Sequence, residues 1–580
     1  MKAILERSSN RKKKQVRVQA VIVLLIAFVF CLSGYAFLKK PKAERALIVN
    51  NVIAEPQLSQ PSGFYTSSFF LSLTSSNPQA KIYFTTDGTK PTIDSDLYQE
   101  PIQISSRADE PNKLSEIKNS PVFFYPISRV FKGCIVRAIT VVNDSIKSQE
   151  TVASYFIHPT GRSRYSLPVF SLVTDEENLF GYKNGIYING ATTDDKDYYL
   201  KNNISIEDYR KGFPTNYKRR GERWERPVVL DFFEGASNLG FKINAGVRIH
   251  GNATRERPQK SLKFYINQKY GDALLNYPLF GPGSLQQQNT FLLRNSGQDM
   301  YKARMRDALM QQILKGNTTL DLQNYRPSIL FINGEYWGIH DIRQRVDEFY
   351  FSHKYNIPLD SLSILGVNMA VEYGKPADSA SFVKLLNFVS KNNMAIPENY
   401  KVVESEMDVD NFIDYIIAEV YCSNPDWPHN NINLWRYNSG KNKEEKSFKD
   451  GRWRWALYDT DIAFGAERPA SYNMLNYLLN KKGLGQLFNK LLDNKAFRIK
   501  FLERFEYHLE NTFQPDKVIK IINSMEKEIA PEMEEHIARW RTFNSAGEWK
   551  KQVEVLRLFA KTRPRYQRQE LDALKARYQQ

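Results

Sequence analysis

Asn424-Pro-Asp-Trp-Pro-His-Asn-Asn-Ile-Asn433 is the stretch from which the architecture of this chain can be worked out. It places Asp426 five positions before Asn431, and an apolar run follows directly. Its two prolines stop any preceding helix, so the carboxylate and the amide are expected on a rigid loop. An Asx-turn capped by its own side chains is the simpler interpretation of any single Asn here. The order of carboxylate, amide and strand favours a catalytic loop instead.

A second polar group follows in Trp453-Arg-Trp-Ala-Leu-Tyr-Asp-Thr-Asp-Ile-Ala-Phe-Gly465. Asp459 ends an apolar strand and Asp461 lies two positions on, so both carboxylates are expected on one side of the strand. A divalent cation would relieve their repulsion, and Mg²⁺ takes carboxylate oxygens together with substrate phosphates. The order Asp426, Asn431, Asp459 is that of a site for phosphoryl transfer from Mg-ATP. The alternatives are two solvated turn acids or the metal-binding DxD pair of a sugar transferase.

A glycine-containing turn is a candidate phosphate contact. Gly246-Val-Arg-Ile-His-Gly-Asn-Ala-Thr254 follows a strand, and it holds Arg248, Asn252 and Thr254. Backbone N–H groups of such a turn and the Thr254 hydroxyl could face a phosphate. Lys260 stands about where a kinase carries the lysine that contacts the α- and β-phosphates. A hairpin turn with surface lysines is the simpler interpretation, and the spacing of a Walker motif is absent.

Length and charge limit the classes of protein to consider. At 580 residues the chain exceeds one hydrophobic core, so two or three domains are expected. The formal net charge of +17 is concentrated at the ends: residues 1–17 hold seven Lys or Arg against one Glu, and residues 550–580 hold nine against three acids. The middle is only mildly basic, which argues against a nucleic-acid partner. Three widely spaced cysteines exclude a disulfide scaffold and a zinc motif.

A charge-free run from Ala20 to Leu38 follows the basic N-terminus. A transmembrane helix needs about 20 apolar residues, so we expect a span at residues 18–38. The positive-inside rule keeps the tail, residues 1–17, in the cytoplasm and places the bulk, beyond a linker at 39–60, outside the cell membrane. A cleaved signal peptide is the alternative, because small residues occur near the end of the run.

Residues 61–158 show the alternating pattern of β-strands separated by turn residues, which predicts a small antiparallel β-sandwich. Within them, Ile82-Tyr-Phe-Thr-Thr-Asp-Gly-Thr-Lys-Pro-Thr92 resembles the C-terminal domain of chitobiases and β-hexosaminidases. Such a module implies a structural spacer, with glycan contact as the alternative role. Strands early and helices late in the remaining chain predict an α+β arrangement.

Residues 165–484 resemble the CotH kinase family, named for a spore coat protein, and residues 485–580 are expected to form a helical extension. The resemblance rests on six blocks in order: Leu167-Pro-Val-Phe-Ser-Leu with Gly185-Ile-Tyr; Gly246 to Thr254 with Lys260; Leu293-Arg-Asn-Ser-Gly-Gln-Asp299 with Met305-Arg-Asp-Ala-Leu309; Asn333-Gly-Glu-Tyr-Trp-Gly-Ile339; Asp426 to Asn431; and Trp455 to Gly465. It implies an atypical protein-kinase-like fold.

The resemblance also implies roles for single residues. Asp426 is expected to be the catalytic Asp, Asn431 and Asp459 the ligands of Mg²⁺ or Mn²⁺, Asp461 the fallback metal acid and Lys260 the lysine that contacts ATP. The expected substrate is a surface or coat protein with an exposed Ser.

One position departs from the family pattern. Gln344 stands where the family often shows the Glu that pairs with the lysine, and a Gln cannot form that ion pair. Nearby Asp341, Asp347 or Glu348 could substitute. The alternative function is therefore a catalytically inactive surface protein that binds partners or glycans. A carbohydrate-active enzyme is disfavoured because no paired-Glu site stands out.

Overall fold

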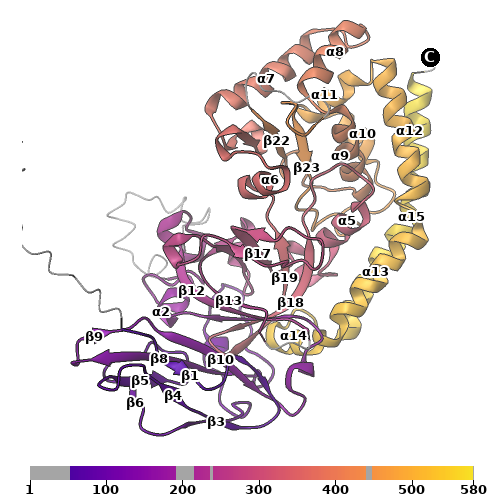
Figure 1. Cartoon of the computed structure of the whole chain (residues 1–580). Helices are drawn as coiled ribbons and strands as arrows, with labels where there is room; N and C mark the ends of the chain where they lie inside the picture. The colour runs from indigo at the N-terminus through magenta and orange to yellow at the C-terminus, as the bar shows by residue number, and fades with distance from the viewer. Residues whose placement is uncertain (1–52, 191–214, 236–238, 439–446, 579–580) are drawn as a thin grey trace, which may run out of the picture. The chain divides into compact units, whose positions relative to one another are not determined.

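The computed structural model describes residues 53–190, 215–235, 239–438 and 447–578. The predicted basic tail and membrane span lie outside these residues. Ala54 to Gln580 belong to one compact unit. Within it, a β-rich part, a closed barrel and a mostly helical part follow one another along the chain (Figure 1). The α+β prediction is thus confirmed, and none of the described helices is long and apolar enough to span a membrane.

The N-terminal β-rich part is built around a six-stranded sheet of order β2-β10-β8-β5-β6, with β9 paired to β8. Its strands are antiparallel except for β2, which runs parallel to β10. Two short pairs, β1·β4 and β3·β7, complete it. Leu71, Ile104, Val136 and Tyr155 form its buried core. The strands are β1 (Gln57–Leu58), β2 (Gly63–Tyr65), β3 (Phe69–Leu71), β4 (Leu73–Thr74), β5 (Lys81–Thr85), β6 (Asp96–Leu97), β7 (Ile102–Ile104), β8 (Cys134–Val142), β9 (Ile146–Lys147) and β10 (Thr151–Ile157).

This β-rich part is fixed to the barrel by a buried carboxylate. Glu335 accepts hydrogen bonds from the backbone N–H groups of Lys113 (2.7 Å), Leu114 (3.1 Å) and Ser115 (2.8 Å). The Leu114 side chain joins the core of the barrel. Bonds from a carboxylate to otherwise buried N–H groups are strong because the acceptor is charged. The segment that carries these groups is therefore held against the barrel.

The barrel has seven strands in the order β11-β12-β13-β14-β17-β19-β18. All neighbours are antiparallel except β11 and β18, which are parallel. Leu262 and Phe264 of β14 face the apolar interior, so by alternation Ser261, Lys263 and Tyr265 lie on the outer face. The strands are β11 (Val169–Val173), β12 (Arg226–Phe233), β13 (Phe241–His250), β14 (Ser261–Tyr265), β17 (Thr290–Arg294), β18 (Tyr325–Ile332) and β19 (Glu335–Gln344).

The helical part contains a second sheet, of order β21-β20-β22-β23. Pairing of β22 with β23 sets Asn433 opposite Ala456. This brings the loop before β22 close to the loop after β23. The strands are β20 (Leu362–Leu365), β21 (Val371–Tyr373), β22 (Asn433–Tyr437) and β23 (Arg454–Ala456), beside a short outlying pair, β15 (Leu275–Asn276) and β16 (Gln287–Gln288).

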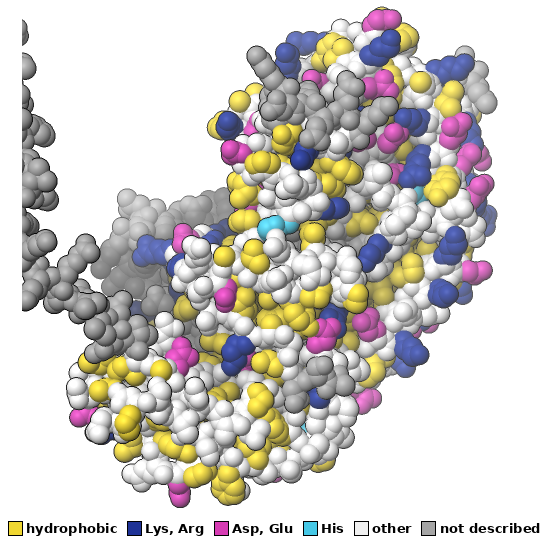
Figure 2. Space-filling view, viewed as in Figure 1, with side chains coloured by type: hydrophobic (Ala, Val, Ile, Leu, Met, Phe, Trp, Pro, Cys, Tyr) yellow, Lys and Arg dark blue, Asp and Glu magenta, His cyan; other side chains and the backbone are white. Residues whose placement is uncertain are grey.

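Helices pack around this sheet and against the barrel (Figure 1). Those of five residues or more are α2 (Glu176–Phe180), α5 (Arg306–Leu314), α6 (Glu348–Tyr355), α7 (Pro376–Lys391), α8 (Pro397–Glu406), α9 (Val409–Cys422), α10 (Met474–Leu479), α11 (Leu484–Leu491), α12 (Lys495–Asn511), α13 (Pro515–Ile529), α14 (Met533–Trp540) and α15 (Ala546–Arg577). On the face in Figure 2, the helices at the right carry Lys/Arg and Asp/Glu side by side, while the β-rich part at the bottom shows mostly uncharged side chains.

The last helix, α15, holds the segment that follows β23. Arg563 is fully buried and donates to the carbonyl oxygens of Tyr421 (3.0 Å), Ala470 (2.8 Å) and Tyr472 (2.8 Å). The rings of Phe464 and Phe559 lie 4.4 Å apart. The end of α9 and residues 464–472 are therefore both fastened to α15.

Candidate functional site

Asp426 lies in a tightly bonded loop at the end of α9. Its backbone N–H donates to the side-chain oxygen of Asn424 (3.2 Å). Its two carboxylate oxygens accept from the amides of Asn430 (2.9 Å) and Asn431 (3.3 Å). The side chain is half-buried and keeps access to solvent. A carboxylate held in one orientation but open to solvent is suited to accept a proton or to orient a hydroxyl.

Asn431 connects this loop to the one after β23. Its amide also donates to the carbonyl oxygen of Asp459 (3.1 Å), 28 positions later in the chain. Asn431 and Asp459 have φ values of 59° and 60°. Non-glycine residues adopt this left-handed region rarely, and they do so mostly where surrounding structure enforces it, often at functional sites. The structure thus brings Asp426, Asn431 and Asp459 together.

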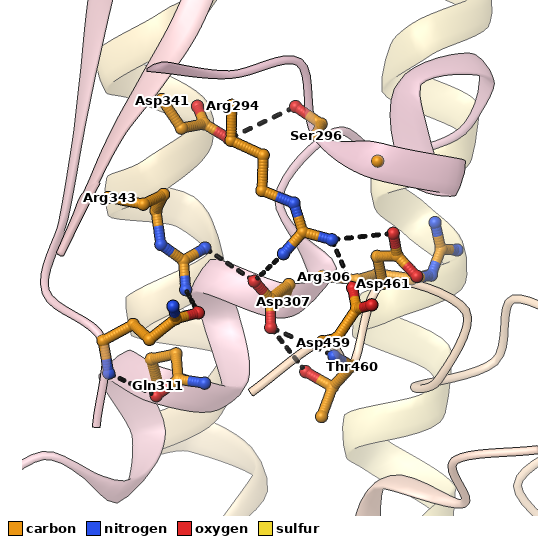
Figure 3. Close-up of polar contacts among 12 residues, drawn as sticks. Arg294, Ser296, Arg306, Asp307, Gln311, Asp341, Arg343, Asp459, Thr460 and Asp461 are labelled. Carbon is orange, nitrogen blue, oxygen red and sulfur yellow. Dashed lines mark hydrogen bonds and ion pairs between the residues drawn. The ribbon is translucent and has the colours of Figure 1, made fainter. Parts of the chain in front are cut away.

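Arg294, at the end of β17, is a central residue that the sequence analysis missed (Figure 3). Its guanidinium pairs with Asp307 (2.6 Å), Asp461 (2.9 Å) and the Asp459 carboxylate. Burial alone would lower the pKa of Arg294, but the charges of Asp459 and Asp307 outweigh it and raise the pKa. Arg294 therefore stays charged and connects the barrel to the loop after β23.

The acids around Arg294 differ in their protonation. Burial would raise the pKa of Asp307, but Arg343 and Arg294 lower it to about 2. Asp307 also accepts from Thr460 (3.0 Å to the N–H). Burial and then the charge of Asp459 raise the pKa of Asp461 to about 8. Asp307 is thus a permanent anion, and Asp461 is largely protonated at neutral pH.

Asp461 anchors a neighbouring loop. Its Oδ2 accepts from the Gln298 N–H (2.8 Å). A Cβ added at Gly297, whose φ is +62°, would lie 1.9 Å from that oxygen, so only glycine fits there. Oδ2 of Asp461, a predicted metal acid, is therefore already shared between the Arg294 guanidinium and the Gln298 N–H.

The donor set can be compared with what Mg²⁺ requires. Within the described part of the chain, no group of three or more His, Cys, Asp or Glu side chains could hold a metal alone. Asp459, whose side chain is 37% exposed, offers a carboxylate, and the side chain of Asn431 is held beside the same residue by its bond to the Asp459 backbone carbonyl. Mg²⁺ is usually bound by one or two protein oxygens plus substrate phosphates. The pair therefore fits Mg²⁺ bound together with ATP.

A buried acid lies beneath this site. Glu419 of α9 accepts from the Asn424 amide (3.0 Å), and the same Asn424 holds the N–H of Asp426. Burial, followed by the charges of Asp307, Asp459 and Asp426, raises the pKa of Glu419 to about 8. Glu419 therefore supports the loop as a largely neutral carboxylic acid.

Lys260 lies in a different environment from the acids. Its ammonium donates to the carbonyl oxygens of Arg255 and Arg257, both at 2.8 Å, and it lies 4.1 Å from the centre of the Tyr217 ring. Burial lowers its pKa well below the usual value. Lys260 thus holds the turn between β13 and β14 together. The structure does not bring it into contact with Asp426, Asn431 or Asp459.

The other predicted phosphate contacts also lie along this turn or strand. Arg248 pairs with Glu225 (2.7 Å) and stacks on Tyr265. Asn252 accepts from Arg220 (3.1 Å). The Thr254 hydroxyl lies where a side chain on Gly251 would be, 2.5 Å from an added Cβ. Arg248 is on the outer face of the barrel, where a ligand could reach it, whereas Asn252 and Thr254 lie in the turn.

Lys263 is the lysine that shares a barrel face with Arg294. The register pairs Arg248 with Lys263, and Lys263 with Leu292, so alternation places Lys263 and Arg294 on the same outer face. Its ammonium lies 3.8 Å from Asp347. Burial, then repulsion by Arg345, lowers the pKa of Lys263 to about 7, although Asp347 opposes the shift. Lys263 is thus a strand lysine paired with an acid, as is the ATP-contacting lysine of kinases.

Gln344 does not face this lysine. It follows Arg343 on β19, and Ile342, two positions before it, belongs to the barrel interior. Gln344 therefore points to the interior side, and its side-chain oxygen accepts from Asn324 (2.6 Å). Of the three acids that could substitute for the missing Glu, the structure pairs Asp347 with a lysine.

Comparison with known proteins identifies both parts of the chain. The family model described as CotH kinase protein matches residues 247–567, which is more than half of the 580 residues. The model of the chitobiase/beta-hexosaminidase C-terminal domain matches residues 60–109. The comparison with curated proteins gave no match. The chain therefore belongs to the CotH kinase family and carries an N-terminal chitobiase/beta-hexosaminidase C-terminal domain.

Proposed function

We propose that this chain is an atypical protein kinase that transfers phosphate from Mg-ATP to serine hydroxyls of surface or coat proteins. Family membership suggests a kinase. The observation that carries the proposal is that Asp426, Asn431 and Asp459 converge from two loops. The Asn431 amide donates to the Asp426 carboxylate (3.3 Å) and to the backbone carbonyl oxygen of Asp459 (3.1 Å). These three side chains supply the acid, the amide and the second acid of phosphoryl transfer.

In this mechanism Asp426 accepts a hydrogen bond from the serine hydroxyl and orients its oxygen toward the γ-phosphate. Asn431 and Asp459 would hold Mg²⁺ or Mn²⁺, which would supply neutralisation of the phosphate charge. Lys263, paired with Asp347, contacts the α- and β-phosphates in place of Lys260, whose ammonium is used within its own turn. Arg294 fixes the distance between the barrel and Asp459.

The proposed location is the outer side of the cell membrane. Support comes from the sequence: seven basic residues precede the charge-free run Ala20 to Leu38. The β-rich N-terminal part would then lie between the membrane and the kinase-like part, with glycan contact as an additional role. Protease added to intact cells should cut the bulk of the chain, and full protection would contradict this orientation.

The kinase activity is tested with the purified full chain, radiolabelled ATP and Mg²⁺ or Mn²⁺. Wild type should label itself or a Ser-rich protein, and Asp426→Ala and Asp459→Ala should not. The two variants should differ in ATP binding: Asp426→Ala should still bind ATP, whereas Asp459→Ala should lose metal-dependent ATP binding. If wild type neither binds ATP nor transfers phosphate, the catalytic proposal is wrong and a non-catalytic interaction protein is the better description.

A further inference from the structure

One face of α9 contacts both ends of the loop that carries Asp426. We refer to residues 424–431 as the Asp426 loop. Tyr415 and Glu419 are four positions apart in α9, so their side chains project from the same side of the helix. Both side chains are fully buried. Glu419 reaches the start of the Asp426 loop, and Tyr415 reaches its middle and its end.

Glu419 acts on the start of the loop through one intermediate residue. Its Oε2 accepts from the Asn424 amide (3.0 Å), and the side-chain oxygen of Asn424 accepts from the backbone N–H of Asp426 (3.2 Å). Asn424 is also fully buried, so water cannot easily replace either bond. The bond to Glu419 turns the Asn424 amide so that its oxygen faces Asp426. Glu419 therefore fixes the direction in which the chain leaves α9 toward Asp426.

Tyr415 acts on the middle and the end of the loop. Its hydroxyl accepts from the indole N–H of Trp427 (3.0 Å) and donates to the backbone carbonyl oxygen of Asn431 (3.3 Å). Asn431 has a φ of 59°, a left-handed conformation that persists where surrounding structure enforces it. The Tyr415 hydroxyl thus helps to hold the Asn431 backbone in the conformation from which its amide reaches Asp426 and the Asp459 carbonyl.

From these contacts we infer that Glu419 and Tyr415 are positioning residues that act on different parts of the reaction. Glu419 directs Asp426 toward the acceptor hydroxyl. Tyr415 directs Asn431 toward the metal bound with ATP. The inference rests on the proposed kinase function and adds two buried residues to it. Small displacements of a reacting group can cost about 10²-fold in rate, and loss of a group that orients a metal ligand costs about 10- to 100-fold in metal affinity.

The first test concerns Glu419 and uses the full chain in mild detergent at pH 7. Glu419→Leu removes the acceptor for Asn424 and should lower kcat by about 10²-fold with an unchanged Kd for Mg-ATP. Burial raises the pKa of Glu419 to about 8, so a neutral Gln resembles its state at pH 7. Glu419→Gln keeps an oxygen that can accept from Asn424 and should restore most of kcat. If Glu419→Gln is as slow as Glu419→Leu, the bond to Asn424 is not the cause and the inference fails.

The second test concerns Tyr415. Tyr415→Phe should raise the Kd for Mg-ATP by about tenfold in calorimetric titrations, and it should lower kcat at saturating Mg-ATP far less than Glu419→Leu does. Tyr421→Phe is the matched control: Tyr421 is equally buried on α9, and its hydroxyl has no hydrogen-bond partner among the described residues. It should change neither constant. If Tyr415→Phe and Glu419→Leu change kcat and Kd to the same extent, both residues merely stabilise the fold and the inference is overturned.

A third measurement needs neither ATP nor metal. The backbone N–H groups of Asp426 and Asn430 are both bonded within the Asp426 loop, the latter to the Asp426 carbonyl oxygen (3.0 Å). Amide hydrogen exchange at these positions should be faster in Glu419→Leu than in wild type and unchanged in Tyr421→Phe. Unchanged exchange in Glu419→Leu overturns the inference while the kinase function stands. If wild type neither binds ATP nor transfers phosphate, the kinase function fails, and with it the assigned roles, even where exchange shows that α9 holds the loop.

Discussion

Replacing Arg294 by Met should lower the free energy of unfolding by about 3 kcal/mol at pH 7. Two of its partners, Asp307 and Asp461, have side chains only 6% exposed. Removing one member of a buried ion pair costs about 3–5 kcal/mol because the other charge is left unpaired. The lower end applies because Asp307 keeps Arg343 at 2.8 Å and Asp461, with a pKa of about 8, is mostly protonated. The third partner, Asp459, has a side chain that is 37% exposed, so water can solvate its carboxylate once Arg294 is removed.

The loss should grow with pH. Without Arg294 the pKa of Asp461 rises above about 8, so above that pH the folded variant keeps a proton that its unfolded chain releases. Stability then falls as pH rises, by at most about 1.4 kcal/mol per pH unit. The free energy of unfolding of wild type falls less, because its Asp461 ionises near pH 8.

Urea unfolding followed by tryptophan fluorescence at pH 7 and pH 9 measures both effects. Arg565→Met is the matched control, because Arg565 is exposed on α15, and it should change stability by less than about 0.5 kcal/mol. A loss below about 1 kcal/mol for Arg294→Met at pH 7, or a gap that does not widen at pH 9, would refute this account of the acid cluster.

Three more outcomes are expected. Asp426→Asn should reduce kcat by about 10²–10⁴-fold with an unchanged Kd for ATP, and a Kd that rises as much as kcat falls would place Asp426 in nucleotide binding instead. ATP should bind more weakly as pH rises from 6 to 9, because Lys263, with a pKa of about 7, loses its charge. Calorimetric titrations should show that Lys263→Arg abolishes this pH dependence. If Lys260→Arg abolishes it instead, the assignment of Lys263 to ATP binding is wrong. Glu335→Gln should destabilise the contact between the β-rich part and the barrel by about 1–3 kcal/mol, seen as faster proteolysis within residues 113–115 than in wild type, and equal proteolysis rates would count against the contact.

The sequence was sufficient to predict the loops of Asp426 and Asp459, but not which lysine shares the outer face of the barrel with Arg294. Asp426, Asn431 and Asp459 are recognisable because prolines, amides and strands fix their local order. Lys260 and Lys263 are three positions apart in one basic stretch, and choosing between them requires knowing that β14 begins at Ser261. Alternation from that residue places Lys263 on the outer face of the barrel. Lys260 lies in the turn before the strand, where its ammonium donates hydrogen bonds to backbone carbonyl oxygens of that turn.

Arg294 and the barrel were beyond sequence reasoning for a related reason. The strand β17 ends in Leu-Leu-Arg, a pattern that predicts an apolar strand with an exposed basic end. Its role depends on Asp459, 165 positions away. Closure of the barrel depends on the parallel pairing of β11 with β18, which joins segments over 150 residues apart and leaves no local signal.

The attachment of the catalytic region to α15 sets an order of assembly during synthesis. Arg563 holds Tyr421 beside the loop of Asp426, and it holds Ala470 and Tyr472 beyond the loop of Asp459 and Asp461. The ribosome makes these carbonyl groups about 90 to 140 residues before the arginine that binds them, and a nascent chain folds only as far as it has emerged. The two loops can therefore reach their final support only when the chain is nearly complete. A protein shortened before Arg563 would contain every proposed catalytic residue and still lack the means to hold them together.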